Sequence, residues 1–392
     1  MSVEVVAPLI FILLFSLLAS GAPLGLVMSG MGVLGSTLII GAEGALALAG
    51  ISVYEAAQSF DLSVIPLFVL MGAVTARSGI SADLFTASER LLARTPGGLG
   101  HATIMACAGF GAVCGSSLAT AATMGRVALP EMKRFGYSDR LATGTVAAGG
   151  TIGILIPPSV IMLIYGILTE TSIGDLFIAG IVPGIILTLL FMATVALIVK
   201  ARPDLAPVNR LDTSADAAPS DNSPDVVNDQ SLRANGDSPR VWPVGLLFLL
   251  VIGGIYSGFF TPTEAAGIGA VGSMVLGFLL RKLTLGSFAE SLLESVETTA
   301  MIFMILIGAI LFSGFLSLSG TPALLGSWIT GLNLGPLGTI ILIVLIYILL
   351  GAFLDTLAMI ILSIPVFFPI AMSMGFDPVS YTHLTLPTIC SV

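Results

Sequence analysis

Charged side chains are scarce in this sequence. Lys, Arg, Asp and Glu together account for 9% of its 392 residues, whereas hydrophobic residues account for 56%. Soluble globular domains carry about 25% charged residues, so this composition excludes a soluble enzyme or a sizeable aqueous domain. A membrane-spanning helix needs about 20 mostly apolar residues. We therefore expect an all-α polytopic membrane protein embedded in a lipid bilayer.

Residues for metal, redox and nucleotide chemistry are also rare. The cysteines Cys107, Cys114 and Cys390 cannot close a disulfide framework, and the first two lie in an apolar segment. The sequence shows neither a P-loop nor a metal-ligand cluster, which argues against direct use of ATP and against a transition metal. The fourteen basic residues flank apolar segments and form no patch for nucleic acid. Hence neither a cofactor nor a nucleic acid partner is expected.

One polar stretch interrupts the apolar chain. Residues 201–240 hold seven Asp and four Arg among many Pro, Ser and Asn residues. Such a composition cannot bury enough apolar surface to fold, so it predicts an acidic, flexible linker. The linker separates a first half, residues 1–200, from a second half, residues 241–379.

The two halves resemble each other. Residues 30–36 recur at residues 267–273, an offset of 237 residues, and further pairs keep an offset of 236–240 over more than a hundred residues. These pairs include Gly111 with Gly351 and Pro130 with Pro369. An offset held for so long indicates an internal duplication, which is typical of membrane transporters built from structural repeats.

The basic residues predict the orientation. With a periplasmic N-terminus, five full crossings bring the chain to the cytoplasmic linker, and all fourteen Lys and Arg residues then lie on the cytoplasmic side. Because five is an odd number, the second half begins on the side opposite to the first, so the repeats are expected to be inverted. In total we expect about eight full crossings and two hairpins.

The segment around residues 95–130 has basic residues on both flanks and a small, polar middle. This pattern predicts that it enters and leaves on one side, either as a re-entrant helical hairpin or as two short spans. Hydroxyl groups of Ser116, Ser117 and Thr120, with backbone carbonyls freed at a break, would offer hard oxygen ligands for Na⁺. The alternative is that these hydroxyls bond to their own helix.

A second interrupted segment covers about residues 141–165. Gly149, Gly150 and Thr151 precede Pro157, Pro158 and Ser159, and this run of glycines and prolines predicts a broken helix. Irregular backbone at membrane depth is tolerated where it is buried in protein or lines a wet cavity. A structural kink without function is the alternative.

The second half offers a charged candidate. Asp355 and Thr356 lie in a predicted hairpin at about residues 336–371, and Asp355 matches Gly115 and Ser116 within a residue when the repeats are aligned. An ionisable group inside a span indicates a functional site. His101 with Ser116 or Ser117 could instead suggest an intramembrane serine hydrolase, but His101 has no orienting partner in the sequence.

Several runs resemble the large membrane subunit of tripartite ATP-independent periplasmic (TRAP) transporters, over roughly residues 1–379. The runs that carry the resemblance are residues 109–121 (GFGAVCGSSLATA), 130–132 (PEM), 156–159 (IPPS), 164–166 (IYG), 177–184 (FIAGIVPG), 261–266 (TPTEAA) and 351–355 (GAFLD).

The resemblance implies two inverted repeats, each with a hairpin and a broken helix, that move a small organic anion, such as a dicarboxylate, by an elevator motion. It implies Na⁺ as the coupling ion, a periplasmic substrate-binding protein and a small four-helix membrane subunit in the bacterial inner membrane. The implied Na⁺ ligands are Ser116, Ser117, Thr120, Gly149, Gly150, Thr151, Asp355 and Thr356. The implied substrate cavity is bordered by Gly115, Pro157, Pro158 and Ser159.

The C-terminal residues depart from this pattern. The counterpart of the Pro157-Pro158 pair would lie beyond Val392, and residues 380–392 match neither the first repeat nor the family. We therefore expect a second repeat that is truncated and lacks its last two spans, with a non-native tail at residues 380–392, and we expect no transport by this chain. A sodium-carboxylate carrier that needs no binding protein is the alternative to the tripartite system.

Overall fold

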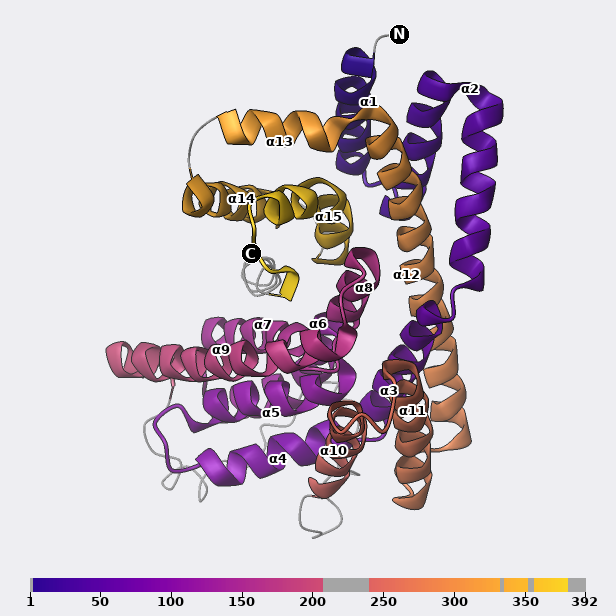
Figure 1. The fold of residues 1–392 in the computed structure, drawn as a ribbon. Helices are drawn as coiled ribbons and strands as arrows, with labels where there is room; N and C mark the ends of the chain where they lie inside the picture. The colour runs from indigo at the N-terminus through magenta and orange to yellow at the C-terminus, as the bar shows by residue number, and fades with distance from the viewer. Residues whose placement is uncertain (1–2, 207–239, 332–334, 352–355, 380–392) are drawn as a thin grey trace. The chain divides into compact units, whose positions relative to one another are not determined.

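The chain is helical, and its helices are mostly apolar. A computed structural model describes residues 3–206, 240–331, 335–351 and 356–379 (Figure 1). The helices of the first half are α1 (Val3–Ala19), α2 (Leu24–Gln58), α3 (Val64–Arg77), α4 (Ile80–Leu92), α5 (Gly98–Cys114), α6 (Ser117–Arg134), α7 (Asp139–Leu155), α8 (Val160–Thr169) and α9 (Ile173–Ala201). Those of the second half are α10 (Trp242–Tyr256), α11 (Pro262–Leu279), α12 (Leu285–Ser319), α13 (Thr321–Gly331), α14 (Gly335–Gly351) and α15 (Thr356–Ser373).

Several helices have the length and composition of a membrane span. Within the described residues, α2, α9, α11 and α12 each qualify alone, and the bent pairs α3 with α4 and α7 with α8 bring the number to six. The shorter apolar helices α1 and α10 begin the two halves. The helices α5, α14 and α15 are likewise apolar and shorter than a span, so the expected number of eight crossings stays a prediction. The linker, residues 207–239, and the tail, residues 380–392, lie outside the described residues.

Two helices extend beyond the apolar segments that the sequence indicates. The sequence has apolar segments at about residues 23–42 and 298–317. However, α2 continues to Gln58 after a non-helical residue at Gly41, and α12 already begins at Leu285. Both extensions contain acidic residues, such as Glu55 and Glu290, which lower the hydropathy without disfavouring a helix. The apolar segments therefore underestimated the helix lengths.

The chain divides into two compact units. One unit comprises Met1–Val69, Ile161–Ala179 and Leu293–Val392, and the other comprises Leu70–Val160 and Gly180–Leu292. We refer to them as the first unit and the second unit. Every Lys and Arg that the structure describes belongs to the second unit, whereas the charged side chains described in the first unit are all acidic. Basic charge is therefore confined to one unit.

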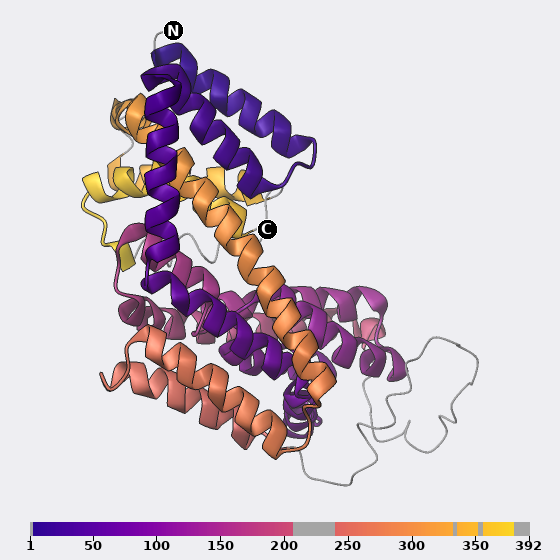
Figure 2. The ribbon, with the colours of Figure 1, turned by 90° about the vertical axis from the view of Figure 1, so that its right-hand side faces the viewer.

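Glycines bring α2 and α12 together in the first unit (Figure 2). A Cβ atom placed on Gly25 would lie 2.7 Å from the Met304 carbonyl oxygen, and one placed on Gly32 would lie 2.6 Å from the Leu311 carbonyl carbon. Both contacts are with backbone, so larger residues would force the helices apart. The glycine-rich run at residues 30–36 therefore serves helix packing.

A reciprocal contact occurs in the second unit. Gly269, which lies 237 residues after Gly32, packs α11 against α3, where a Cβ atom would lie 2.5 Å from the Met71 sulfur. Met71 in turn lies 240 residues before Leu311, the partner of Gly32. The second helix of each half thus packs against a helix of the other half.

Tight turns recur with the same offset. Glycines with positive φ occur in pairs that are 237–241 residues apart: Gly21 and Gly258, Gly79 and Gly320, Gly97 and Gly335, and Gly136 and Gly375. Helix lengths recur as well, since α5 and α14 have 17 residues each and α6 and α15 have 18. Backbone conformation thus follows the offset found in the sequence.

Candidate functional site: two interrupted helices that meet

α5 and α6 form an antiparallel pair. Near the start of α5, the Leu99 N–H donates to the Tyr137 hydroxyl, just beyond the end of α6, at 3.2 Å, and the Thr103 hydroxyl lies 3.6 Å from the Met132 sulfur. The two helices are connected at the other end by Gly115 and Ser116 alone. This geometry is that of a helical hairpin, and it extends to Arg134 rather than to residue 130.

The connection has the residues that a break requires. Gly115 ends α5 in the left-handed region, with φ +65°, which favours glycine. Ser116 is extended and caps α6, since its side chain accepts a hydrogen bond from the Ala119 N–H at 3.4 Å. Ser117 is the first residue of α6. Thus the polar run at the middle of the segment forms the tip of the hairpin.

The second interruption is shorter than the sequence indicates. α7 remains helical through Gly149, Gly150 and Thr151 to Leu155, and the break is confined to residues 156–159, with a cis peptide between Pro157 and Pro158. The helix predicted to be broken at about residues 141–165 is thus interrupted at the prolines, and the preceding glycines remain helical.

The glycines of α7 pack against the hairpin instead. A Cβ atom on Gly149 would lie 2.7 Å from the Cys107 sulfur of α5, and one on Gly150 would lie 2.7 Å from the Ala121 Cβ of α6. The Thr151 hydroxyl donates to the Ala148 carbonyl of its own helix. The predicted role of these residues as Na⁺ ligands assumed backbone carbonyls freed by an unwound helix. Because their backbone is helical, this part of the prediction has no support.

The two breaks lie against each other. The Val160 N–H, at the start of α8, donates to the Gly115 carbonyl at 3.3 Å. A Cβ atom on Gly115 would lie 2.3 Å from the Pro158 carbonyl oxygen and 3.3 Å from the Ser159 Cα. Gly115, Pro158 and Ser159, predicted from separate segments, are thus brought together, and all three are buried.

Thr120 supplies a buried hydroxyl beside the tip of the hairpin. Its side chain is fully buried, and its Oγ1 atom makes no hydrogen bond within the described residues. This atom lies 2.9 Å from where a Cβ atom on Gly153 of α7 would be, and the Ser116 carbonyl oxygen lies 3.3 Å from the same point. Gly111 also meets Gly153 here, with only 2.6 Å between its Cβ position and the Gly153 Cα.

Gly111 and Gly153 were not singled out as site residues from the sequence. They allow α5 and α7 to approach closely beside Thr120, and the signal that could have located them is their position four residues before Gly115 and before Pro157. Pairing them requires the tertiary register, which no local pattern contains.

The chemistry available at this junction is that of oxygen ligands. The Ser116 carbonyl and the Thr120 hydroxyl both lie against Gly153, and the Pro158 carbonyl lies against Gly115. Such hard oxygen donors suit an alkali or alkaline-earth cation rather than a transition metal. In the described part of the chain, no group of three or more His, Cys, Asp or Glu residues could hold a metal ion.

The predicted second site is described only in part. α14 and α15 pack together through the Tyr347 hydroxyl, which lies 2.8 Å from the Ser363 hydroxyl. Thr356 is the first residue of α15, whereas Asp355 lies outside the described residues. Both helices belong to the first unit and the hairpin of α5 and α6 to the second.

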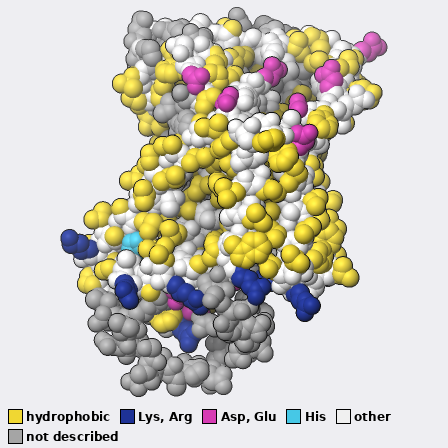
Figure 3. Space-filling view, turned by 60° about the horizontal axis from the view of Figure 1, so that its bottom comes forward, with side chains coloured by type: hydrophobic (Ala, Val, Ile, Leu, Met, Phe, Trp, Pro, Cys, Tyr) yellow, Lys and Arg dark blue, Asp and Glu magenta, His cyan; other side chains and the backbone are white. Residues whose placement is uncertain are grey.

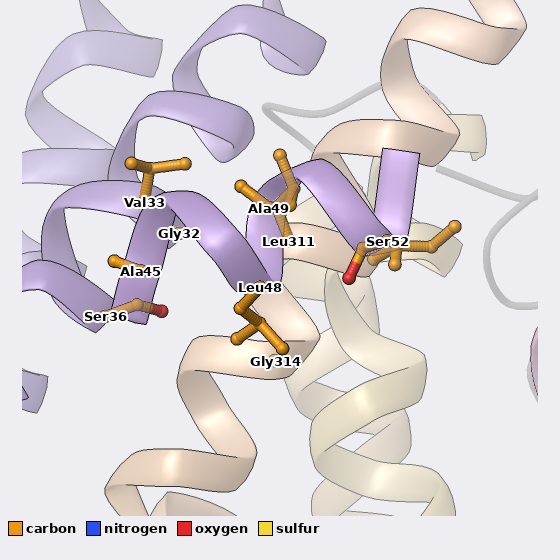
Figure 4. A pocket seen from close by; sticks show the side chains of 10 residues that line it. Gly32, Val33, Ser36, Ala45, Leu48, Ala49, Ser52, Leu311 and Gly314 are labelled. Atoms are coloured by element: carbon orange, nitrogen blue, oxygen red, sulfur yellow. The ribbon is translucent and has the colours of Figure 1, made fainter. Parts of the chain in front are cut away.

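Two pockets occur in the first unit, and the predicted substrate residues line neither. The larger has a volume of about 690 Å³ and is lined by α2, α8, α12, α13 and α15, including Ser59, Ser313, Ser317 and Phe368. The other lies between the two parts of α2 and α12 (Figure 4). Its volume of about 10 Å³ is too small for more than one water molecule.

His101 cannot act with Ser116 or Ser117. Its Nδ1 lies 3.0 Å from the Gly97 carbonyl oxygen at the start of α5. Because an α-helix rises 1.5 Å per residue, about 20 Å of helix separates His101 from the tip of the hairpin. The geometry therefore excludes a Ser–His dyad.

The helical arrangement is similar to that of a solved transporter structure. The solved structure titled "Crystal structure of the Alcanivorax borkumensis YdaH transporter reveals an unusual topology" matches with a TM-score of 0.58 over 90% of this chain and 78% of that chain, at 17% identity. The fold is thus that of a helical membrane transporter.

Sequence comparison is more specific. A model of the family described as "Tripartite ATP-independent periplasmic transporter, DctM component" matches residues 11–391, a range that includes most of the tail expected to lie outside the family. The C4-dicarboxylate TRAP transporter large permease protein DctM of Pseudomonas aeruginosa is 36% identical, covering 84% of this chain and 73% of that protein. The sialic acid TRAP transporter large permease protein SiaM of Vibrio cholerae is 33% identical over 83% and 72%. The chain belongs to the DctM family of TRAP transporter large permeases, which are transporter subunits and not enzymes.

Proposed function

We propose that this chain is the large permease subunit of a Na⁺-coupled importer of small organic anions. The observation that carries the proposal is the junction of two interrupted helices, where the buried Thr120 hydroxyl, which has no hydrogen-bond partner in the described residues, lies with the Ser116 carbonyl against Gly153 of α7. A buried hydroxyl without a hydrogen bond costs about 1 to 3 kcal/mol. A bound cation would offset this cost, because it would use the hydroxyl oxygen as a ligand.

Na⁺ is the proposed ion. Ser116, Ser117 and Thr120 would hold it with carbonyl groups of the tip, and Asp355 and Thr356 would contribute a second site in the other hairpin. No acidic side chain is among the residues that the described junction brings together. A monovalent ion suits such a neutral site, because it needs less negative charge than a divalent ion.

The partners follow from the family. Its description names a tripartite periplasmic transporter, which supports a periplasmic substrate-binding protein and a small membrane subunit as the other two components. Relatives are named for C4-dicarboxylate and for sialic acid, so we place the substrate among small organic anions such as dicarboxylates. The site of transport would be the bacterial inner membrane, with the linker in the cytoplasm.

The transport motion would use inverted repeats. The recurring helix lengths, positive-φ glycines and reciprocal contacts of Gly32 and Gly269 support a duplicated fold with pseudo-twofold symmetry. In the proposed elevator motion, the hairpins and the interrupted helices would move the substrate together.

Thr120→Val tests the ion site, because valine keeps the shape and removes the hydroxyl. We expect Na⁺ to raise the melting temperature of the purified parent protein relative to choline at equal ionic strength, since a ligand of the folded state stabilises it. In Thr120→Val, the Na⁺ concentration for half-maximal stabilisation should rise at least about tenfold, for a loss of roughly 1.4 kcal/mol of binding energy.

Thr103→Val is the matched control. Thr103 is also fully buried in the hairpin, but its hydroxyl donates to the Leu99 carbonyl of its own helix at 2.8 Å. Its substitution should lower stability slightly and leave the Na⁺ response unchanged. If Thr120→Val only stabilises the protein and responds to Na⁺ like the parent, Thr120 is an unsatisfied core residue and the ion site is wrong. Uptake that needs no binding protein would favour the simpler carrier.

A further inference from the structure

Three helix ends converge at one corner of the second unit. The start of α5 touches the end of α4, since a Cβ atom on Gly98 would lie 2.6 Å from the Leu92 carbonyl oxygen. It also touches the end of α9, since Cβ atoms on Gly97 and Gly100 would each lie 2.9 Å from a methyl group, of Val199 and Val195 respectively. The residues that follow α4 and α9 are therefore held close together.

Four basic side chains surround this corner, which we call the α4–α9 corner. Arg90 and Arg94 lie at the end of α4, and Lys200 and Arg202 lie at the end of α9. All four are exposed, and within the part of the chain that the structure describes, no ion pair engages any of them. Lys133 and Lys282 of the same unit, in contrast, are paired with Asp139 and Asp83.

The acidic side chains on the same elements do not neutralise the corner. Glu89 on α4 has a partner within the protein, and Asp204 follows α9 on an exposed turn. The corner therefore keeps an excess of positive charge at the end of two helices.

Exposed apolar side chains adjoin these charges. Leu91, between Arg90 and Arg94, is 71% exposed, and Leu197, one turn before Lys200 and Arg202, is 67% exposed. Only 11% of the apolar window of α9 is buried inside the protein. Figure 3 shows Lys and Arg side chains along one edge, next to apolar side chains. A soluble anion would leave this apolar surface uncovered, whereas a lipid matches both features.

We propose that the α4–α9 corner binds an anionic phospholipid. Arg and Lys side chains hydrogen-bond to the headgroup phosphate, and the acyl chains lie along the exposed apolar face of α9. Clusters of basic residues next to membrane helices recognise anionic lipids in this way. Because α5 begins at this corner and ends at Gly115, a bound lipid would fix the base of the hairpin whose tip carries the proposed ion site.

The test uses the double variant Arg94→Gln/Lys200→Gln of the purified chain in mixed micelles. Phosphatidylglycerol should raise the melting temperature of the parent above the value in phosphatidylcholine. In the double variant, half-maximal stabilisation should need roughly thirtyfold more phosphatidylglycerol, since two of the basic contacts are lost. A melting temperature equal to that of the parent in phosphatidylcholine would show that the variant is folded.

The control Arg126→Gln/Arg281→Gln removes the same net charge. Both residues are exposed, belong to the second unit and lie on elements outside the corner, so the lipid response should stay within about twofold of the parent. An equal loss in the control would show a general charge effect and overturn the proposal. An undiminished response in the Arg94→Gln/Lys200→Gln variant, or equal stabilisation of the parent by inorganic phosphate, would also overturn it.

Discussion

Gly115 is the residue on which the junction of the two breaks depends. It combines a positive φ with close contact to the Pro158 carbonyl, and its own carbonyl accepts from Val160. Each condition alone favours glycine, because a side chain would be strained by the backbone and would also overlap a backbone oxygen. Both conditions arise from tertiary contact at a turn between two helices.

Gly115→Ala should therefore be severely destabilising. A Cβ atom 2.3 Å from a backbone oxygen requires a shift of α8 or of the hairpin tip, and positive φ adds about 1 to 2 kcal/mol for a residue with a Cβ atom. We expect a total loss of more than about 2 kcal/mol, measured by unfolding of the purified protein, together with a loss of the Na⁺ response.

Gly144→Ala is the matched control. Gly144 lies in the middle of α7, and a Cβ atom there would meet nothing within 4 Å. Since alanine is the better helix former, stability should rise by roughly 0.5 to 1 kcal/mol. If both substitutions have the same small effect, the contact between the breaks does not constrain the site.

The sequence predicted where the two helices are interrupted better than it predicted which residues of each segment are non-helical. Gly115 and Ser116 stand out because glycine followed by serine is a favourable end and start of helices. Gly149 and Gly150 are also glycines in an interrupted segment, but they remain helical. Cys107 and Ala121 of the hairpin occupy the space that their side chains would need. Whether a glycine ends a helix or packs against another depends on a neighbour far away in the sequence.

Among the elements, the bend between α3 and α4 is flanked by two ion pairs to residues in or just before α12. The two helices bend by 64° at Ser78 and Gly79. Arg77 before the bend pairs with Glu290 of α12, and Asp83 after it pairs with Lys282, just before α12. Because Asp83 lies on α4 and Arg77 on α3, rotating α4 about the bend would break the pair of Asp83 with Lys282.

Double-mutant cycles should give a larger coupling energy for an ion pair at this bend than for an ordinary surface pair. The side chains of Asp83 and Lys282 are 21% and 30% exposed, so the cycle of Asp83→Asn with Lys282→Gln should give a coupling energy of about 1 kcal/mol. The pair of Lys133 and Asp139 is 58% and 72% exposed, and the cycle of Lys133→Gln with Asp139→Asn should give less than about 0.5 kcal/mol. Equal coupling energies in the two cycles would contradict a special role of the bend.

Element boundaries were predictable where hydropathy and helix formation coincide. The apolar segments located the helices well, but the acidic beginning of α12 and the end of α2 are helical without being apolar. The same Glu290 that lowers hydropathy there pairs with Arg77. Such pairing explains why charged residues extend these helices, and it depends on the fold rather than on local composition.

For the whole molecule, the distribution of basic residues is a strong constraint. Every Lys and Arg in the described ranges lies in the second unit, and a membrane protein keeps such residues on its cytoplasmic side. The predicted sidedness rests on where Lys and Arg fall along the sequence, and it stays a prediction. Each of the two units combines segments that are far apart along the chain. The constant offset between the halves does not predict which segments belong to the same unit.

The turns at Gly21 and Gly258 can decide whether the repeats are inverted. Ser20 and Ser257 precede these turns at equivalent positions 237 residues apart, and both are exposed. In a background with Cys107, Cys114 and Cys390 replaced by serine, Ser257→Cys should react with a membrane-impermeant maleimide added to spheroplasts. Ser20→Cys should react only after the membrane is opened, as should Lys200→Cys, the cytoplasmic reference. An inverted duplication places equivalent turns on opposite sides. Labelling of Ser20→Cys and Ser257→Cys from the same side would mean that the repeats are parallel. The chain would then cross the membrane an even number of times between the two turns, so one of the predicted crossings would have to be a helix pair that re-enters the membrane.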